Sequence, residues 1–281
     1  MPLSSLNSEQ LGAAKAPLGK NLIIASAGTG KTSTIVGRIS YLLHSGFRPQ
    51  DILLLTFTNK AASEMISRLG RYFDEQTVSS IEAGTFHAVS YRLLKKKGLV
   101  THLKEPRELK TLFRSIYEKR VFGHLSDVKP YSYGYLFDIY SLFLNTSGGS
   151  FGDWLGGRSE EQKVFRQIYD DIVLDYEETK NHYGYAGYND LLLKFLEFAK
   201  GVGTPLFREI LVDEYQDTNF LQQRLLESLN PPSLFCVGDY DQSIYAFNGA
   251  DISIIAGFKE RNGGSNVFSL TKNYRSSASI L

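Results

Sequence analysis

The sequence has few of the features of a secreted, membrane-spanning or disulfide-stabilised protein. Its 281 residues include one cysteine, Cys236, so neither a disulfide nor a cysteine-based metal site can form within the chain. No apolar run approaches the roughly 20 residues of a membrane-spanning helix. The apolar run at residues 22–25 is too short for a signal peptide and has no basic leader. We therefore expect a cytoplasmic protein with no membrane partner.

The chain also lacks a strong net charge. Its 31 Lys and Arg balance 30 Asp and Glu, and the formal charge of +1 provides no global attraction to nucleic acid. The distribution is uneven, however. Residues 91–130 contain 11 basic and 4 acidic side chains, a net of +7, whereas residues 151–200 contain 6 and 10, a net of −4. The basic stretch has helical spacing, which is typical of a solvated helix face or of a phosphate-binding face.

A glycine-rich loop, ASAGTGKT, occupies residues 25–32. The short apolar run before it predicts a buried strand of a parallel sheet, and residues 33–43 have the apolar spacing of a helix. Backbone N–H groups of such a loop and helix N-terminus bind phosphate. Lys31 would then reach the β- and γ-phosphates, and the Thr32 hydroxyl would ligate Mg²⁺. Ala25 stands where the usual pattern has glycine, and its side chain is small enough to be tolerated.

A second motif, ILVDEYQDT, occupies residues 210–218. Its apolar start predicts another strand, which would deliver Asp213 to Mg²⁺ and Glu214 to the water that attacks the phosphate. The Asp-Glu pair could instead simply begin a helix, where the dipole favours acids. The glycine-rich loop favours the catalytic interpretation. Together the two motifs indicate a nucleotide-hydrolysing motor core.

Further motifs make the chain resemble one family, the superfamily 1 DNA helicases of the UvrD/Rep/PcrA type. The matching segments are LNSEQ at residues 6–10, LTFTNKAA at 55–62, GTFH at 84–87, VGDYDQSIYAFNGA at 237–250 and NYRSS at 273–277. They follow the family's order and cover both ends of the chain, so only the middle is poorly matched.

The resemblance implies an ATP site. Gln10 would read the adenine, Tyr274 would stack on it, and Gln242 and Arg275 would sense the γ-phosphate. The cation of such an arginine stabilises charge in the transition state. The expected catalytic residues are Lys31, Asp213, Glu214, Gln242 and Arg275; the expected ATP contacts are Gln10, Ser26, Ala27, Gly28, Thr29, Gly30, Lys31, Thr32, Ser33, Tyr274 and Arg275; and the expected Mg²⁺ ligands are Thr32 and Asp213. Ser33 replaces an arginine that stacks on adenine in many relatives, which predicts weaker nucleotide affinity or base selectivity.

The resemblance also implies contacts to single-stranded DNA. The expected residues are Phe57, Thr58, Asn59, Thr85, His87, Tyr245 and Phe247. Aromatic rings suit a motor that does not read sequence, since every base can stack on them for roughly 1–3 kcal/mol. Each ring could instead be a core aromatic; the motifs favour DNA contact for Phe57 and Tyr245. Phe247 and Asn248 replace the Trp-Arg pair of many relatives, which predicts a looser grip.

The fold class that we predict is α/β: a P-loop NTPase (RecA-like) parallel sheet with an inserted all-helical subdomain. Strand-like runs near residues 21–25, 52–57, 80–84, 209–212, 234–237 and 266–270 alternate with helical patterns. We expect a RecA-like ATP-binding domain in two parts, 1–88 and 189–281, around a helical DNA-binding insertion, 89–188. Asp190 is predicted to be the N-cap of the helix that follows. The insertion's place in the family favours DNA contact for its lysines, Lys95, Lys96 and Lys97 first.

The motifs and the resemblance predict the N-terminal motor half of an ATP-dependent DNA helicase, an ATP hydrolase that acts in DNA repair or replication. The resemblance alone implies that it translocates 3′ to 5′. Its partners would be single-stranded DNA and ss/ds junctions, with repair or replication proteins as candidates. Relatives continue into a C-terminal RecA-like domain that closes over ATP, so we expect this chain alone to bind nucleotide without unwinding. Two alternatives stay open: the motor part of a helicase–nuclease, and a non-hydrolysing DNA-binding scaffold module.

Overall fold

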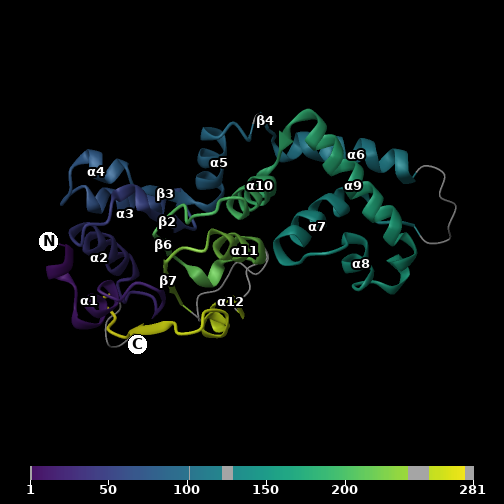
Figure 1. Cartoon of the computed structure of the whole chain (residues 1–281). Helices are drawn as coiled ribbons and strands as arrows, with labels where there is room; N and C mark the ends of the chain where they lie inside the picture. The colour runs from purple at the N-terminus through teal and green to yellow at the C-terminus, as the bar shows by residue number, and fades with distance from the viewer. Residues whose placement is uncertain (1, 101, 122–128, 240–252, 276–281) are drawn as a thin grey trace. The chain divides into compact units, whose positions relative to one another are not determined.

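The structure, a computed structural model, describes residues 2–100, 102–121, 129–239 and 253–275 (Figure 1). The chain divides into two compact units. One is formed by residues up to 89 together with those from 196 onward, and the other by residues 90–195. No helix in the described ranges has both the length and the apolar character needed to cross a membrane.

The first unit is built on a six-stranded parallel sheet with the order β3-β2-β6-β7-β1-β8. The strands are β1 (Lys20–Ala25), β2 (Ile52–Thr56), β3 (Glu82–Thr85), β6 (Glu209–Val212), β7 (Ser233–Gly238) and β8 (Asn266–Leu270). Every residue of β2, β6 and β7 is buried, as expected for strands covered on both faces, whereas the edge strand β8 is partly exposed. The predicted parallel α/β sheet is therefore confirmed.

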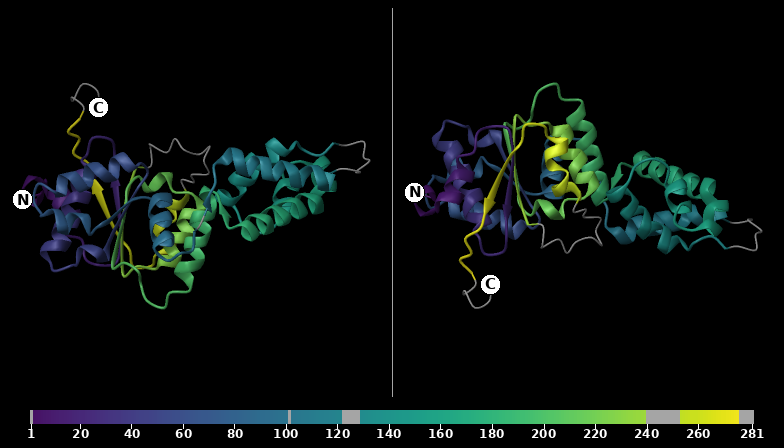
Figure 2. Two further views of the ribbon diagram at one scale, coloured as in Figure 1. Left: turned by 90° about the horizontal axis from the view of Figure 1, so that it is seen from above. Right: turned by 90° about the horizontal axis from the view of Figure 1, so that it is seen from below.

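Helices cover both faces of this sheet. They are α1 (Ser8–Ala14), α2 (Lys31–His44), α3 (Asn59–Leu69), α4 (Glu75–Ser79), α11 (Phe220–Leu229), α12 (Ser253–Ala256) and α13 (Phe258–Arg261). Figure 2 shows α1, α2 and α3 on one face and α11 and α12 on the other. The connection from β1 to β2 and the connection from β6 to β7 run in opposite directions along the sheet, so right-handed crossovers place their helices on opposite faces. Such a reversal opens a crevice at the carboxyl ends of the strands.

One ion pair lies inside the core of the first unit. Arg38 of α2 and Glu209 of β6 are both fully buried, with 3.0 Å from Nε to Oε1 and 3.3 Å from Nη2 to Oε2. The guanidinium also donates to the carbonyl oxygen of Ala16 and lies over the ring of Phe235. The pair therefore links a helix to the middle of the sheet.

The second unit is mainly helical. It contains α6 (Pro106–Val121), α7 (Tyr133–Thr146), α8 (Phe151–Gly156), the 3₁₀ turn η3 (Glu160–Phe165) and α9 (Arg166–Tyr183), while α5 (Phe86–Lys96) and α10 (Tyr188–Lys200) carry the chain between the units. Its core is rich in aromatic side chains, among them Phe113, Phe143 and Tyr169. Two short parallel strands, β4 (His102–Leu103) and β5 (Tyr185–Ala186), were not predicted, because runs of two residues show no periodicity.

Asp190 does not have the predicted role. Helix α10 begins at Tyr188, so Asp190 lies inside its first turn and the N-cap prediction is wrong. The carboxylate instead accepts a hydrogen bond of 2.6 Å from the N–H of Gly187 and two of 2.8 Å from Lys180. It therefore joins the end of α9 to the start of α10.

Several cations of the basic stretch of the second unit pair with carboxylates. Lys110 pairs with Asp138 of α7, Arg114 with Glu118 of its own helix, and Arg120 with Asp171 and Asp175 of α9. These acids lie mostly outside residues 91–130, so the local count overstates the charge that the surface presents. DNA binding by the insertion stays a prediction.

Candidate functional site

The glycine-rich loop joins the end of β1 to the start of α2. Gly28 has a φ of +78° and Gly30 a φ of +89°, a region that favours glycine, and Gly30 is the N-cap of α2 with no side-chain cap. Thr29 closes the turn, with its N–H and its hydroxyl both donating to the carbonyl of Ser26. The N–H groups at the start of α2 are thus available to an anion.

Gln10 holds this loop from the N-terminal side. It is 4% exposed, and its Nε2 donates to the carbonyl of Thr29 at 2.8 Å. Its Oε1 accepts from the N–H of Asn7, which completes the capping box of α1. A Cβ on Gly30 would lie 2.3 Å from Nε2, so glycine makes room for this contact. Both ends of the Gln10 amide are bound within the protein, and its adenine role stays a prediction.

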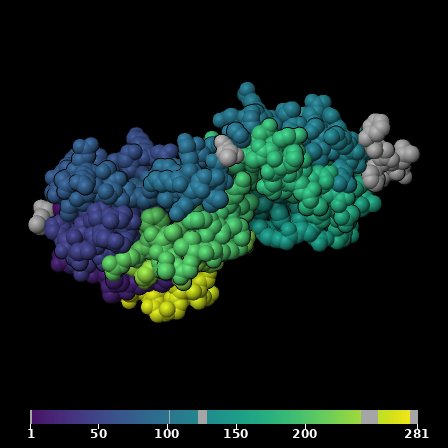
Figure 3. Space-filling view, turned by 45° about the horizontal axis from the view of Figure 1, so that its top comes forward, coloured from purple at the N-terminus to yellow at the C-terminus, as the bar shows by residue number. Residues whose placement is uncertain are grey.

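The last described residues hold the same loop from the other side. Asn273 donates to the carbonyl of Ala27 at 2.8 Å, and the N–H of Tyr274 donates to that of Gly28 at 2.8 Å. The Tyr274 hydroxyl accepts from the side chain of Asn7 at 2.7 Å. Figure 3 shows the C-terminal residues (yellow) beside the N-terminal ones (purple) on the surface of the first unit. Two ends of the sequence thus meet at the loop.

These segments enclose an open cleft. It is lined by Ala27, Gly28, Gly30, Lys31, Thr32, Ser33, Arg68, Glu214, Tyr274 and Arg275, and its volume is about 950 Å³ with open solvent included. That space is enough for a nucleoside triphosphate. Arg68, near the end of α3, was not predicted, because nothing in its own sequence neighbourhood distinguishes it from a surface cation paired with Glu64.

The acidic motif meets the loop across this cleft. Asp213 and Glu214 follow β6, which is separated from β1 by β7 alone. Lys31 Nζ lies 2.7 Å from Glu214 Oε2. Glu214 has a φ of +48° and a ψ of +48°, an unusual conformation for a residue other than glycine. Such backbone strain is concentrated at functional sites.

Asp213 lies deeper, at 9% exposure. Its Oδ1 is buried and has no hydrogen-bond partner among the described residues, and the same holds for Oδ1 of Asp217. Burial, with the nearby charge of Glu214, raises the pKa of Asp213 to about 7 and that of Asp217 to about 6, while Lys31 opposes both shifts. Asp217 was not predicted, although it lies within the acidic motif.

This arrangement fits a magnesium ion. A buried carboxylate oxygen without a partner is costly unless a cation compensates it, and Mg²⁺ prefers such oxygen ligands. Within the described ranges no group of three or more His, Cys, Asp or Glu side chains converges. Mg²⁺ typically uses one or two carboxylates and completes its shell with phosphate and water. Ligation of Mg²⁺ by Asp213 and Thr32 stays a prediction.

The predicted DNA contacts in the described ranges gather at the ends of β2 and β3. The two strands are paired, with Thr56 opposite Thr85. The half-buried Phe57 and the exposed Thr58 and Asn59 follow β2, and Thr58 caps α3. Thr85 ends β3 and His87 lies just beyond it, where burial lowers the pKa of the imidazole. Contact with DNA stays a prediction, and Gln242, Tyr245 and Phe247 lie outside the described residues.

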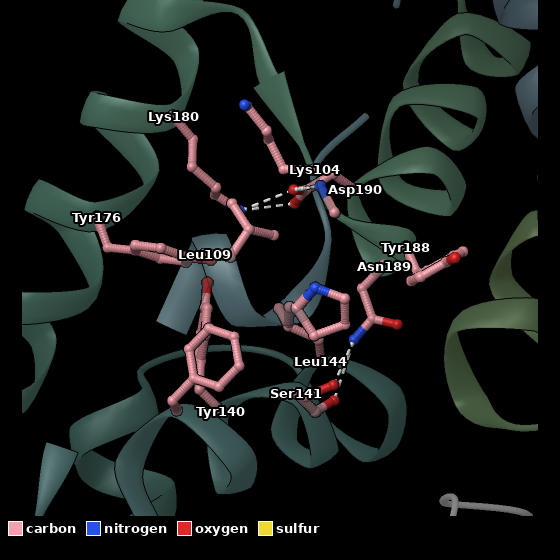
Figure 4. A pocket seen from close by; sticks show the side chains of 13 residues that line it. Lys104, Leu109, Tyr140, Ser141, Leu144, Tyr176, Lys180, Tyr188, Asn189 and Asp190 are labelled. Carbon is pink, nitrogen blue, oxygen red and sulfur yellow. Dashed lines mark hydrogen bonds and ion pairs between the residues drawn. The ribbon is translucent and has the colours of Figure 1, made fainter. Parts of the chain in front are cut away.

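A second hollow lies in the second unit, and it has a different chemistry (Figure 4). Its lining is mostly apolar, with Leu109, Tyr140, Leu144 and Tyr176 among others. The ammonium of Lys180 forms ion pairs with Asp190 and Glu177, at 2.8 Å each, and Lys104 pairs with Glu108. Both lysines of this hollow are thus neutralised, which makes it a poor phosphate site.

Comparisons with known proteins identify helicases as relatives of this chain. The model of the UvrD/REP helicase N-terminal domain matches residues 6–262. Similar curated proteins include the putative ATP-dependent DNA helicase YjcD of Bacillus subtilis, 31% identical over 297 residues that cover 100% of this chain and 38% of the relative. The ATP-dependent DNA helicase Rep of Buchnera aphidicola is 32% identical, with 99% and 44% covered. The ATP-dependent DNA helicase PcrA of Staphylococcus aureus is 30% identical, and the match covers 99% of this chain and 39% of the relative.

The chain therefore spans well under half the length of these three relatives. The family match extends over most of the chain and includes both the glycine-rich loop and the acidic motif. The chain belongs to the UvrD/REP helicase N-terminal domain family.

Proposed function

We propose that this chain is the ATP-binding motor half of a DNA helicase or translocase, which couples ATP hydrolysis to movement along single-stranded DNA. The observation that carries the proposal is the 2.7 Å contact between Lys31 and Glu214, whose positions are 183 residues apart in the sequence. A phosphate-binding cation and a candidate general base thereby face the same cleft.

The geometry suggests how hydrolysis would proceed. Lys31 would exchange Glu214 for the β- and γ-phosphates, which the N-terminus of α2 would bind. The carboxylate released in this exchange would orient the attacking water and accept its proton. Arg275, which lines the cleft, would stabilise charge on the transferred phosphoryl group. The ring of Tyr274, 55% exposed, would offer a stacking face to adenine.

A magnesium ion bound by Asp213 and Thr32 would neutralise phosphate charge. The backbone N–H of Asp213 also donates to the carbonyl of Leu55 at 2.9 Å. Leu55 belongs to the motif that continues into Phe57, Thr58 and Asn59. A shift of β6 on hydrolysis would thus reach the proposed DNA contacts through its pairing with β2, which this hydrogen bond extends.

The finer parts of the proposal rest on the family. These are 3′ to 5′ translocation, ss/ds junctions as substrates, and a role in DNA repair or replication. A C-terminal RecA-like domain that closes over the nucleotide is the expected partner of this chain within the motor.

ATP hydrolysis by the full-length protein, with and without single-stranded DNA, tests the proposal. We expect DNA-stimulated turnover that falls roughly 10²–10⁴-fold in Glu214→Gln, because the general base is lost. Affinity for a fluorescent ATP analogue should stay close to that of the wild type. Glu118→Gln, the same change on an exposed face of α6, is the matched control. DNA-stimulated turnover that survives in Glu214→Gln would exclude the assigned role, and a wild type without turnover would favour the scaffold.

A further inference from the structure

Gln216 is a buried amide directly beside the proposed general base. It lies in the 3₁₀ turn η4 (Tyr215–Asp217) that follows Glu214, and it is 1% exposed. Its Nε2 donates to Glu214 Oε2 at 2.8 Å and, over a longer 3.4 Å, to Asp217 Oδ2, and its Oε1 accepts from the N–H of Asp239 at 3.0 Å. Both ends of the side chain are therefore engaged, the nitrogen with carboxylates of the acidic motif and the oxygen with the residue that follows β7.

Simple chemistry determines the orientation of this amide. The backbone N–H of Asp239 is a donor, so the oxygen of Gln216 must face it. The NH₂ group must then face Glu214, whose ionised carboxylate only accepts. Rotating the amide by half a turn would oppose donor to donor and acceptor to acceptor. Gln216 thus donates to Glu214 by necessity.

The backbone around Gln216 is shaped for this contact. The left-handed conformation of Glu214 and the bond from the N–H of Asp217 to the carbonyl of Glu214 fold the chain back at once. On the other side, a Cβ on Gly238 would lie 3.0 Å from Oε1 of Gln216 and 2.9 Å from Cδ1 of Ile255. Glycine at the end of β7 therefore leaves room for the amide.

We propose that Gln216 is a positioning residue that holds the Glu214 carboxylate in the orientation needed for hydrolysis. This inference rests on the proposed function. Both hydrogen bonds described for the carboxylate, from Lys31 and from Gln216, reach Oε2. Lys31 has to turn to the phosphates when nucleotide binds, whereas Gln216 is tied to β7 and stays. Its hydrogen bond keeps Oε2 occupied and leaves Oε1 to accept the proton of the attacking water.

Two substitutions separate the donor contacts of Gln216 from its acceptor contact. Gln216→Leu removes both kinds, while Gln216→Glu retains an acceptor for Asp239 and, once ionised, loses the donor to Glu214 and Asp217. Gln223→Leu is the matched control, because Gln223 is also buried and bridges Glu227 and the Tyr215 hydroxyl. Each variant is made in the full-length protein, alone and combined with Glu214→Gln.

We expect kcat for ATP to fall roughly 10- to 100-fold in both Gln216 variants, as for a lost hydrogen bond to a charged group. KM and the affinity for a fluorescent ATP analogue should change less than about threefold, because the hydrogen bonds described for Gln216 go to Glu214, Asp217 and Asp239 and not to the loop. In the Glu214→Gln background the same changes should cost less than about twofold, since the carboxylate to be positioned is absent. Gln223→Leu should leave kcat near the wild-type value.

Hydrogen exchange provides a readout that is independent of turnover. The amide of Asp239 should exchange faster in Gln216→Leu and stay protected in Gln216→Glu, which keeps its acceptor. Losses that multiply in the Glu214→Gln background, equal losses in Gln216→Leu and Gln223→Leu, or unchanged Asp239 exchange would each overturn the inference. A wild type without ATP turnover would remove the proposed function, and the catalytic role of Gln216 with it.

Discussion

Removing the carboxylate of Asp213 should stabilise the protein while it abolishes magnesium-dependent turnover. The side chain is buried at the end of β6, beside a second acid and with one oxygen unpartnered. Burial and the charge of Glu214 raise its pKa from the ordinary 3.8 to about 7. The folded protein therefore binds this proton more tightly than the unfolded chain does. The stability that this tighter proton binding adds to the folded state is fully present below about pH 4 and is lost as the pH rises to about 7.

The magnitude follows from these values. At about 1.36 kcal/mol per pKa unit, the difference between 3.8 and about 7 lowers the free energy of unfolding by about 4 kcal/mol above pH 7, relative to a pH at which Asp213 is protonated in both states. At pH 5 the same relation lowers the free energy of unfolding by about 1.6 kcal/mol. Asp213→Asn has no charge to bury, so its stability gain over the wild type should be about 3 kcal/mol larger at pH 8 than at pH 5. Any cost of fitting the new amide applies at both pH values and cancels in this comparison.

Urea unfolding followed by circular dichroism, in EDTA and without nucleotide, measures this difference. Asp138→Asn is the control: this carboxylate is 67% exposed and pairs with Lys110, so its removal should cost under about 1 kcal/mol. A gain that is the same at pH 5 and pH 8, or a loss at pH 8, would refute the reasoning.

Two further substitutions test the core and the loop. Glu209→Ala removes the ion-pair partner of the fully buried Arg38 guanidinium and should lower the free energy of unfolding in urea by about 3–5 kcal/mol. Arg114→Ala, in an exposed pair, should lower it by under about 1 kcal/mol. Similar losses in the two variants would contradict the burial argument. Gly28→Ala places a Cβ 2.7 Å from Oδ1 of Asn273 at a φ of +78°, so affinity for a fluorescent nucleotide should fall about 10- to 100-fold. Gly12→Ala, with nothing within 4 Å of the added carbon, should bind normally, and equal binding by both would argue against the fit between loop and Asn273.

The strands of the sheet could be predicted because buried parallel strands are short apolar runs. Residues 52–56, 209–212 and 233–238 are buried throughout, so their hydrophobicity is visible without any partner. The short ribbon of β4 and β5 could not be predicted, since two-residue strands carry no pattern. The position of Asp190 was misjudged for a related reason: helix boundaries depend on which backbone groups are already satisfied.

The electrostatics of the insertion show what a linear count omits. Residues 91–130 have a net charge of +7. In the fold, Arg120 meets Asp171 and Asp175 of α9, and Lys110 meets Asp138 of α7. Opposite charges that are far apart in the sequence neutralise each other only when the fold brings them together. A basic stretch in the sequence therefore does not by itself establish a basic surface.

The glycine-rich loop and the acid pair of the cleft could be predicted from the sequence, because each is a short motif that follows an apolar strand; their catalytic roles stay predictions. Which groups assist them was decided only by the tertiary structure. Gln10 and Asn273 hold the loop from opposite ends of the chain, and Gln216 reaches Glu214 only through the strained turn and its anchor at Asp239. Hydrogen bonds of this kind depend on distance and direction between segments, and neither quantity is encoded in the local pattern.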